Sequence, residues 1–232
     1  MSGFFDVYSI IFLIIAVVIF MRLGSVLGRR TGNEPSPYDP RVKPTAGARN
    51  DNVVALPARE RGSAATAEPV DLEPLSKYAS PGTPVHEGLV GVSKASPDFD
   101  AEHFLAGARV AYEMIVTAFA QGDRKQLQNL LASDVYDGFV AAIDERERKK
   151  ETAELTFVGI EESKITAAEL DGSDARISVR FVAELISCTR DKNGTVVDGD
   201  ASEVQTIRDA WTFARDVSSR DPNWKLVATE AV

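Results

Sequence analysis

The first 30 residues contain the longest apolar run of the chain, and this run has no polar side. No ionisable side chain lies between Asp6 and Arg22. A helix over residues 7–23 would be apolar on every face and would span about 25 Å, near the lower limit for crossing a bilayer core. The pattern predicts one membrane-spanning anchor, with its apolar positions at Val7, Ile10, Ile11, Phe12, Leu13, Ile14, Ile15, Val17, Val18, Ile19, Phe20 and Met21.

Two other interpretations of this run fit less well. A secretory signal peptide has a basic start and a small-residue cleavage site. Here no Lys or Arg precedes the run, and Arg22 follows it. A helix lying flat in the membrane interface would carry a strongly charged face, and this one has none.

Basic residues on one side of the run predict its orientation. Arg22, Arg29 and Arg30 follow the apolar segment, whereas only Asp6 precedes it. Lys and Arg next to a span favour the cytoplasmic side and an anionic membrane surface. We therefore expect the amino terminus outside and the rest of the chain in the cytoplasm.

A proline-rich stretch follows the anchor. Ten of the eleven prolines lie between residues 35 and 97, among Gly, Ala, Ser and Thr and with few large apolar residues. Such a segment buries too little surface to offset the entropy of ordering. The sequence predicts a disordered tether over residues 31–96.

Helical periodicity begins after the tether. Ser96 and Pro97 suit a helix start, and Gly122 suits its end. A short amphipathic helix is expected next, and then a third helix from Ser133 that ends in the charged run 144–150, expected to be a solvated face. The first helix carries one apolar stripe of Phe104, Ala108, Tyr112, Ile115 and Phe119.

From residue 152 the period changes to two, which indicates strands. Ile177, Val179, Phe181, Ala183 and Leu185 alternate with mainly polar residues, as in a strand with one buried face. Asp171-Gly172 marks a turn, and Asn193-Gly194 and Asp198-Gly199 are expected to bracket a loop. Helices followed by an antiparallel sheet predict an α+β domain over residues 97–232.

Charge and composition exclude several functions. The net charge is −9, divided into +3 over residues 1–50 and −12 over the remainder. An acidic domain argues against nucleic-acid binding. The single cysteine, Cys188, and two histidines cannot form a Cys-rich or His-rich metal site. We expect no metal, no cofactor and no nucleic-acid partner.

Eight segments of the chain form a familiar pattern: residues 4–8, 29–34, 104–119, 122–123, 130–131, 134–139, 211–215 and 223–226. They resemble the bacterial TimA adaptors and the carboxyl-terminal domain of the mitochondrial import motor-adaptor subunit, the Tim-forty-four-like family. The resemblance covers residues 1–34 and about 100–232.

This resemblance implies a fold like that of nuclear transport factor two, with an apolar pocket between helices and a curved sheet. It also implies a non-enzymatic adaptor, single-pass in the bacterial inner membrane, that binds an unidentified membrane or membrane-associated protein, or an acyl chain. The proline-rich tether does not match the mitochondrial segment that engages the chaperone, so an Hsp70-type partner is not carried over. Seven aromatic residues are the pocket candidates, although core packing is the plainer interpretation of each: Phe104, Tyr112, Tyr136, Phe139, Phe181, Trp211 and Phe213.

Two alternative functions stay open at the level of sequence. Folds of this type also host small-molecule enzymes, for which Glu102 with His103 or Tyr136 with Asp137 are candidate acid/base pairs. Adjacent helical residues point to different sides, so neither is a ready dyad. A tether for ribosomes or an assembly factor is the other alternative.

Overall fold

The computed structural model describes residues 73–232. The predicted anchor, its basic flank and the predicted tether up to residue 72 lie outside these residues. Within residues 73–232 no helix is both long and apolar enough to cross a membrane. The described chain begins with a 3-10 helix, η1 (Glu73–Lys77), followed by α2 (Pro84–Ala95).

Helix α2 corrects the predicted end of the tether. The prediction of disorder through residue 96 is wrong from residue 73 onward, because this segment packs on the domain. Pro84 occupies the first turn, and Thr83 caps it by accepting from the backbone N–H of His86 at 3.3 Å. The side chains of Leu89 and Val92 are fully buried. Pro84, one of the prolines that suggested a tether, thus begins a packed helix.

Three further helices follow, close to their predicted places. α3 (Ala101–Gln121) is capped by Asp100 rather than by Ser96, which instead ends α2. Gly122 ends α3 in the left-handed conformation with φ of 70°, as the sequence indicates. α4 (Arg124–Leu130) and α5 (Ser133–Lys149) complete the helical part.

The four strands form one antiparallel sheet in sequence order: β1 (Thr152–Asp171), β2 (Asp174–Arg190), β3 (Val196–Asp216) and β4 (Lys225–Ala231). The predicted alternation in β2 is confirmed, since Ile177, Val179 and Phe181 are all fully buried. The loop expected up to Asp198-Gly199 is wrong. Strand β3 begins at Val196, and Gly199 pairs with Cys188 before an irregularity over residues 201–204.

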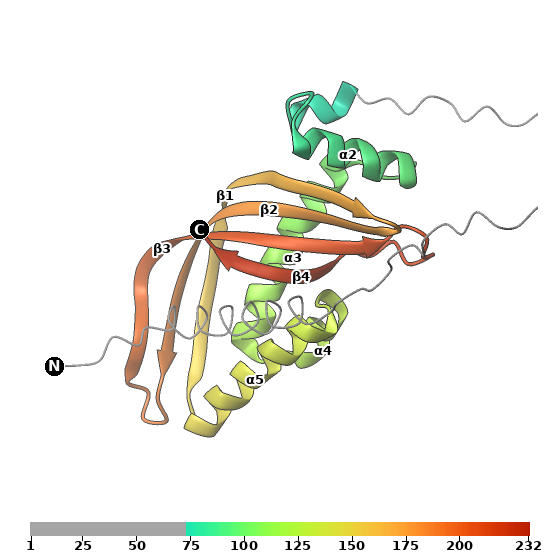
Figure 1. The fold of residues 1–232 in the computed structure, drawn as a ribbon. Helices are drawn as coiled ribbons and strands as arrows, with labels where there is room; N and C mark the ends of the chain where they lie inside the picture. Colours follow the sequence, from blue (N-terminus) through green and yellow to red (C-terminus); the bar gives the residue numbers. More distant parts are fainter. Residues whose placement is uncertain (1–72) are drawn as a thin grey trace, which may run out of the picture.

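Figure 1 shows how these elements are arranged: α3 crosses the sheet, α2 lies beside β1, and α4 and α5 lie at the other end of α3. Helix α3 joins the sheet through two aromatic groups. At its amino end, the ring of Phe104 lies 4.8 Å from that of Trp224. In its middle, the ring of Tyr112 lies 4.4 Å from that of Trp211 and 4.8 Å from that of Phe181. The α+β class is therefore confirmed. The carboxyl half of α3 lines a cavity between the helices and the sheet.

Candidate functional site

A cavity of about 500 Å³ opens between helices α3 and α5 and the sheet. This volume is within the usual range for sites that bind small molecules or a few side chains. Helices supply one wall and strands β1 to β4 the other. The main apolar lining residues are Tyr112, Val116 and Phe119 from α3, Phe139 and Ala142 from α5, and Leu155, Leu185, Ile207 and Trp211 from the sheet.

The seven aromatic pocket candidates divide between this cavity and the core. Tyr112, Phe139 and Trp211 line the cavity. The other four, Phe104, Tyr136, Phe181 and Phe213, are not among its lining residues and pack in or against the hydrophobic core. Phe104 lies two turns before Tyr112 on α3, where it packs on Phe213 and not on the cavity wall. Sequence periodicity finds the buried face but does not divide it between core and cavity.

A buried tyrosine and a carboxylate meet in the lining of the cavity. The hydroxyl of Tyr112 on α3 donates to Oδ2 of Asp209 on β3 at 2.7 Å. Tyr112 is 1% exposed, and Asp209 lies between Phe181 of β2 and Ala231 of β4 in the sheet. Burial raises the pKa of Asp209, and the hydrogen bond from Tyr112 opposes this rise. Burial, and next the charge of Asp209, raises the pKa of Tyr112 as well.

The second oxygen of Asp209 has no partner among the described residues, and it is not enclosed in protein. In the described part of the chain, the only fully buried side-chain nitrogen or oxygen without a hydrogen bond is Nε of Arg215. The Oδ1 atom of Asp209 is therefore accessible, and Asp209 is one of the residues that line the cavity. Sequence reasoning missed this residue, although Asp209 shares the inward face of β3 with Ile207 and Trp211. The signal available in the sequence was an acidic residue at an inward position of the strand, between two apolar residues.

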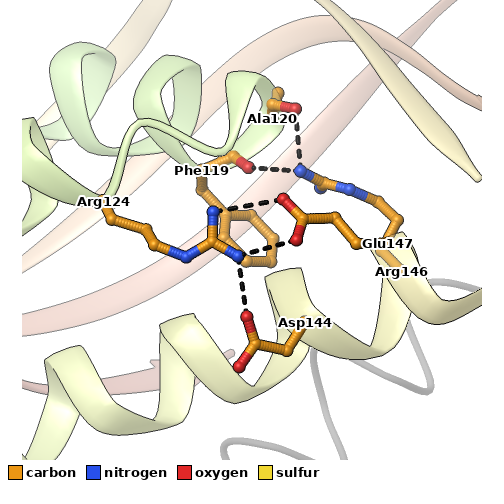
Figure 2. A network of polar contacts seen from close by, with 6 residues as sticks. All are labelled: Phe119, Ala120, Arg124, Asp144, Arg146 and Glu147. Carbon is orange, nitrogen blue, oxygen red and sulfur yellow. Dashed lines mark hydrogen bonds and ion pairs between the residues drawn. The ribbon is translucent and has the colours of Figure 1, made fainter.

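An arginine network fixes α5 against the end of α3 and the start of α4 (Figure 2). The guanidinium of Arg124 contacts Asp144 at 2.7 Å and makes two hydrogen bonds to Glu147, at 2.9 and 3.1 Å. The side chain of Arg124 is 35% exposed, so solvent screens these ion pairs and their contribution to stability is modest. Their bidentate geometry nevertheless sets the orientation of α5, which carries one cavity wall.

Arg146 turns inward from the charged run that was expected to be solvated. Its Nη2 atom donates to the carbonyls of Phe119 and Ala120 at 3.0 and 2.9 Å, as Figure 2 shows. These are carbonyls from the last turn of α3, where a cation is favourable. The guanidinium also lies 5.5 Å from the ring centre of Phe119. Burial lowers the pKa of Arg146.

On the sheet side, the cavity rim contains Cys188 and Glu154, and Arg190, which is not a lining residue, contacts Glu154. The thiol of Cys188 contacts a Glu154 oxygen at 3.4 Å, and Nε of Arg190 donates to the other oxygen at 3.0 Å. Burial, followed by the contact with Glu154, raises the pKa of the Cys188 thiol. A raised pKa keeps the thiol protonated, so this rim does not resemble a nucleophile site.

The acid/base pairs considered from sequence do not meet in the cavity. Glu102 and His103 lie in the exposed first turn of α3, and neither lines the cavity. Tyr136 and Asp137 on α5 are also absent from the lining. In the described residues, no group of three or more His, Cys, Asp or Glu side chains could hold a metal ion.

Comparison with known proteins places this architecture in a family. The model of the Tim44-like domain matches residues 85–231, which is more than half of the chain. The chain belongs to the Tim44-like family. The match begins within α2, in agreement with the packing of that helix on the domain.

Two curated relatives carry the same domain. A "probable mitochondrial import inner membrane translocase subunit tin-44" of Caenorhabditis elegans is 23% identical over 159 residues, 67% of this chain and 37% of the relative. "Mitochondrial import inner membrane translocase subunit TIM44-1" of Arabidopsis thaliana is 20% identical over 122 residues, 53% of this chain and 26% of the relative. The chain thus covers well under half the length of these Tim44 proteins.

Among solved structures, the intermembrane space region of the chloroplast protein ARC6 aligns with a TM-score of 0.40 at 15% identity. The alignment covers 59% of this chain and 98% of that structure.

Proposed function

We propose that this Tim44-like chain is a membrane-anchored adaptor without enzymatic activity, whose cavity holds an apolar segment of a protein partner. The observation that carries the proposal is the cavity of about 500 Å³, which is lined largely by apolar side chains. Apolar surface left open in this way contributes binding energy when a partner covers it. The relatives named as inner-membrane translocase subunits support a role beside a membrane.

The anchor is part of this proposal. The apolar run between Asp6 and Arg22 would hold the chain in the bilayer, with the domain on the cytoplasmic side. Changing Ile14 and Val17 together to Asp is expected to move the chain from the membrane pellet to the soluble fraction, because buried charge opposes insertion. Fractionation of cells after a carbonate wash measures this. A double variant that still pellets with membranes contradicts the anchor.

Occupancy of the cavity can be tested with one pair of neighbouring alanines on α5. Ala142 lines the cavity, whereas Ala141 is exposed. Ala142→Trp fills part of the cavity and is expected to reduce partner capture at least about tenfold, the equivalent of about 1.4 kcal/mol. Ala141→Trp adds the same side chain outside and should leave capture unchanged.

The measurement is photo-crosslinking in intact membranes with p-benzoylphenylalanine in place of Leu155, which lies in the cavity wall. We expect a discrete protein adduct that Ala142→Trp removes and Ala141→Trp retains. Melting curves of both variants check that the domain stays folded. Equal adducts in the two variants would place the partner elsewhere on the domain, and a lipid adduct alone would replace the protein partner with an acyl chain.

The geometry of Tyr112 and Asp209 favours binding over catalysis. The proton of the Tyr112 hydroxyl is directed to Asp209 at 2.7 Å, so it is not available to stabilise charge on a substrate. No second acid or base contacts the pair among the described residues. Turnover of a small carbonyl substrate by the purified chain, lost on Asp209→Asn, would overturn the adaptor proposal.

A further inference from the structure

The cavity lining is largely apolar, but it also contains charged side chains, which differ in number between acids and bases and in whether they already have a partner. Five acidic and three basic residues line it. Each of the basic residues is already engaged or turned away. Arg146 donates to the carbonyls that end α3, and Nζ of Lys149 lies 3.6 Å from Glu145. Arg208 is the neighbour of Asp209 on β3, and strand alternation directs its side chain to the opposite face of the sheet.

Asp209 differs from the other acids in the lining because it combines burial with an open acceptor. Its Oδ2 atom is held by Tyr112 at 2.7 Å, which fixes the position of the carboxylate. Its Oδ1 atom is accessible and has no partner among the described residues. A fixed acceptor in apolar surroundings is a strong site for an N–H donor, and above all for a cation.

We propose that Asp209 selects the partner segment of the cavity, and that this segment is apolar and carries a lysine whose ammonium group binds Oδ1 of Asp209. This inference rests on the proposed function of the cavity and adds the chemistry of its ligand. A fatty-acid carboxylate or a lipid phosphate would meet the Asp209 carboxylate with like charge. The partner is therefore a protein segment and not an anionic lipid.

Tyr112 acts as a positioning residue in this arrangement. It touches Asp209 and not the lysine, and its hydrogen bond keeps Oδ2 turned to α3 so that Oδ1 faces the cavity. The ring of Trp211, whose centre lies 4.4 Å from that of Tyr112, lines the cavity beside this pair. The apolar stem of a lysine side chain can pack on such a ring while its charged end reaches the acid.

The inference can be tested with the full chain in nanodiscs of phosphatidylcholine, a neutral lipid. The probes are two short synthetic peptides of Leu, Ala and Ser with blocked ends, identical except for one central Lys or Glu. The chain has two tryptophans, so 5-fluorotryptophan gives two fluorine resonances, and Trp211→Phe assigns the one in the cavity. Titration of the Trp211 resonance gives the affinity of each peptide.

We expect the Lys peptide to bind at least about tenfold more tightly than its Glu twin, as one charge-assisted hydrogen bond provides. Asp209→Asn keeps an acceptor for Tyr112 but removes the charge, and it should reduce this ratio to about twofold or less. Glu203→Gln, an exposed acid on the same strand outside the cavity, should leave the ratio unchanged.

The outcomes separate the inference from the proposed function. Equal affinity of the two peptides for the unchanged protein, or an unaltered ratio in Asp209→Asn, overturns the role of Asp209 while the cavity remains a binding site. Failure of both peptides to shift the Trp211 resonance overturns the binding function itself. A greater loss of Lys-peptide affinity in Glu203→Gln than in Asp209→Asn would assign the selectivity to surface charge.

Discussion

Gly88→Ala is expected to destabilise the domain by about 3 kcal/mol, because helix α2 meets the backbone of β1 at this glycine. A Cβ atom at Gly88 would lie 1.8 Å from the carbonyl oxygen of Ala168 and 2.5 Å from its carbonyl carbon. A backbone carbonyl in a sheet cannot move aside as a flexible side chain can. Helix α2 would therefore have to move away from β1, exposing part of Leu89 and Val92, which are fully buried.

Gly91 on the same helix provides a matched control. A Cβ atom there would meet Cβ of Leu170 at 3.9 Å, an ordinary van der Waals distance. Gly91→Ala should stabilise the protein by about 0.5–1 kcal/mol, since alanine loses less entropy in a helix than glycine. Thermal unfolding of the two variants measures the contrast, with a fall in Tm on the order of 10 °C expected for Gly88→Ala. Similar melting temperatures for both variants would show that α2 is not part of the folded unit.

This contrast concerns helix α2, which lies in the segment that the sequence predicted to be a disordered tether. In residues 73–95 the pattern is short of large apolar residues and rich in Pro and Gly, which is typical of a tether. The structure shows that few side chains are enough here, because Gly88 allows α2 to approach β1 closely and to bury Leu89 and Val92. Close approach is a tertiary property, and periodicity in one segment does not contain it.

Elements with a single buried face were predicted well for a physical reason. In α3 the stripe from Phe104 to Ile115 packs on the sheet, and in β2 Ile177, Val179 and Phe181 face the helices. Each pattern reflects one contact surface, so the period of the apolar residues is sufficient to find it. The boundary at Gly122 followed from local backbone geometry in the same way.

The candidate site could be predicted only in part, because it joins distant segments. Tyr112 was singled out as an aromatic on the apolar stripe, but its partner Asp209 lies 97 residues later in the chain. The topology that brings α3 over β3 is needed to pair them. Without it, Asp209 is one acid in a strand that also contains exposed acids such as Asp200 and Glu203.

Removal of the Tyr112 hydroxyl tests whether this pair contributes to folding as the structure indicates. Tyr112→Phe is expected to lower the free energy of unfolding at pH 7 by about 1–3 kcal/mol, because it leaves the Asp209 carboxylate without its only hydrogen-bond donor in the described chain. Tyr136→Phe is the matched control. Tyr136 is half-buried and its hydroxyl makes no hydrogen bond to the described residues, so the change in the free energy of unfolding should stay within about 0.5 kcal/mol.

The pH dependence distinguishes the loss of a carboxylate partner from a simple packing defect. Burial raises the pKa of Asp209 in the folded protein above its ordinary value, so the folded state binds the extra proton. Its contribution to stability is therefore fully present below the ordinary pKa of Asp and decreases as the pH rises through the raised value. The hydrogen bond from Tyr112 opposes the rise in the pKa of Asp209 and so limits this decrease.

Tyr112→Phe should consequently be more damaging at pH 7 than at acid pH, because protonation of Asp209 removes the charge that the hydroxyl stabilises. Asp209→Asn removes the titrating group, so its stability relative to the unchanged protein should increase over the same rise in pH. Urea unfolding of both variants at several pH values measures these changes in stability. Comparison with Tyr136→Phe at each pH removes the contribution of the other carboxylates, which titrate in all three variants. A cost for Tyr112→Phe that does not change with pH would mean that the hydroxyl does not stabilise an ionised Asp209. In that case the fixed anion on which lysine recognition depends would be absent from the cavity.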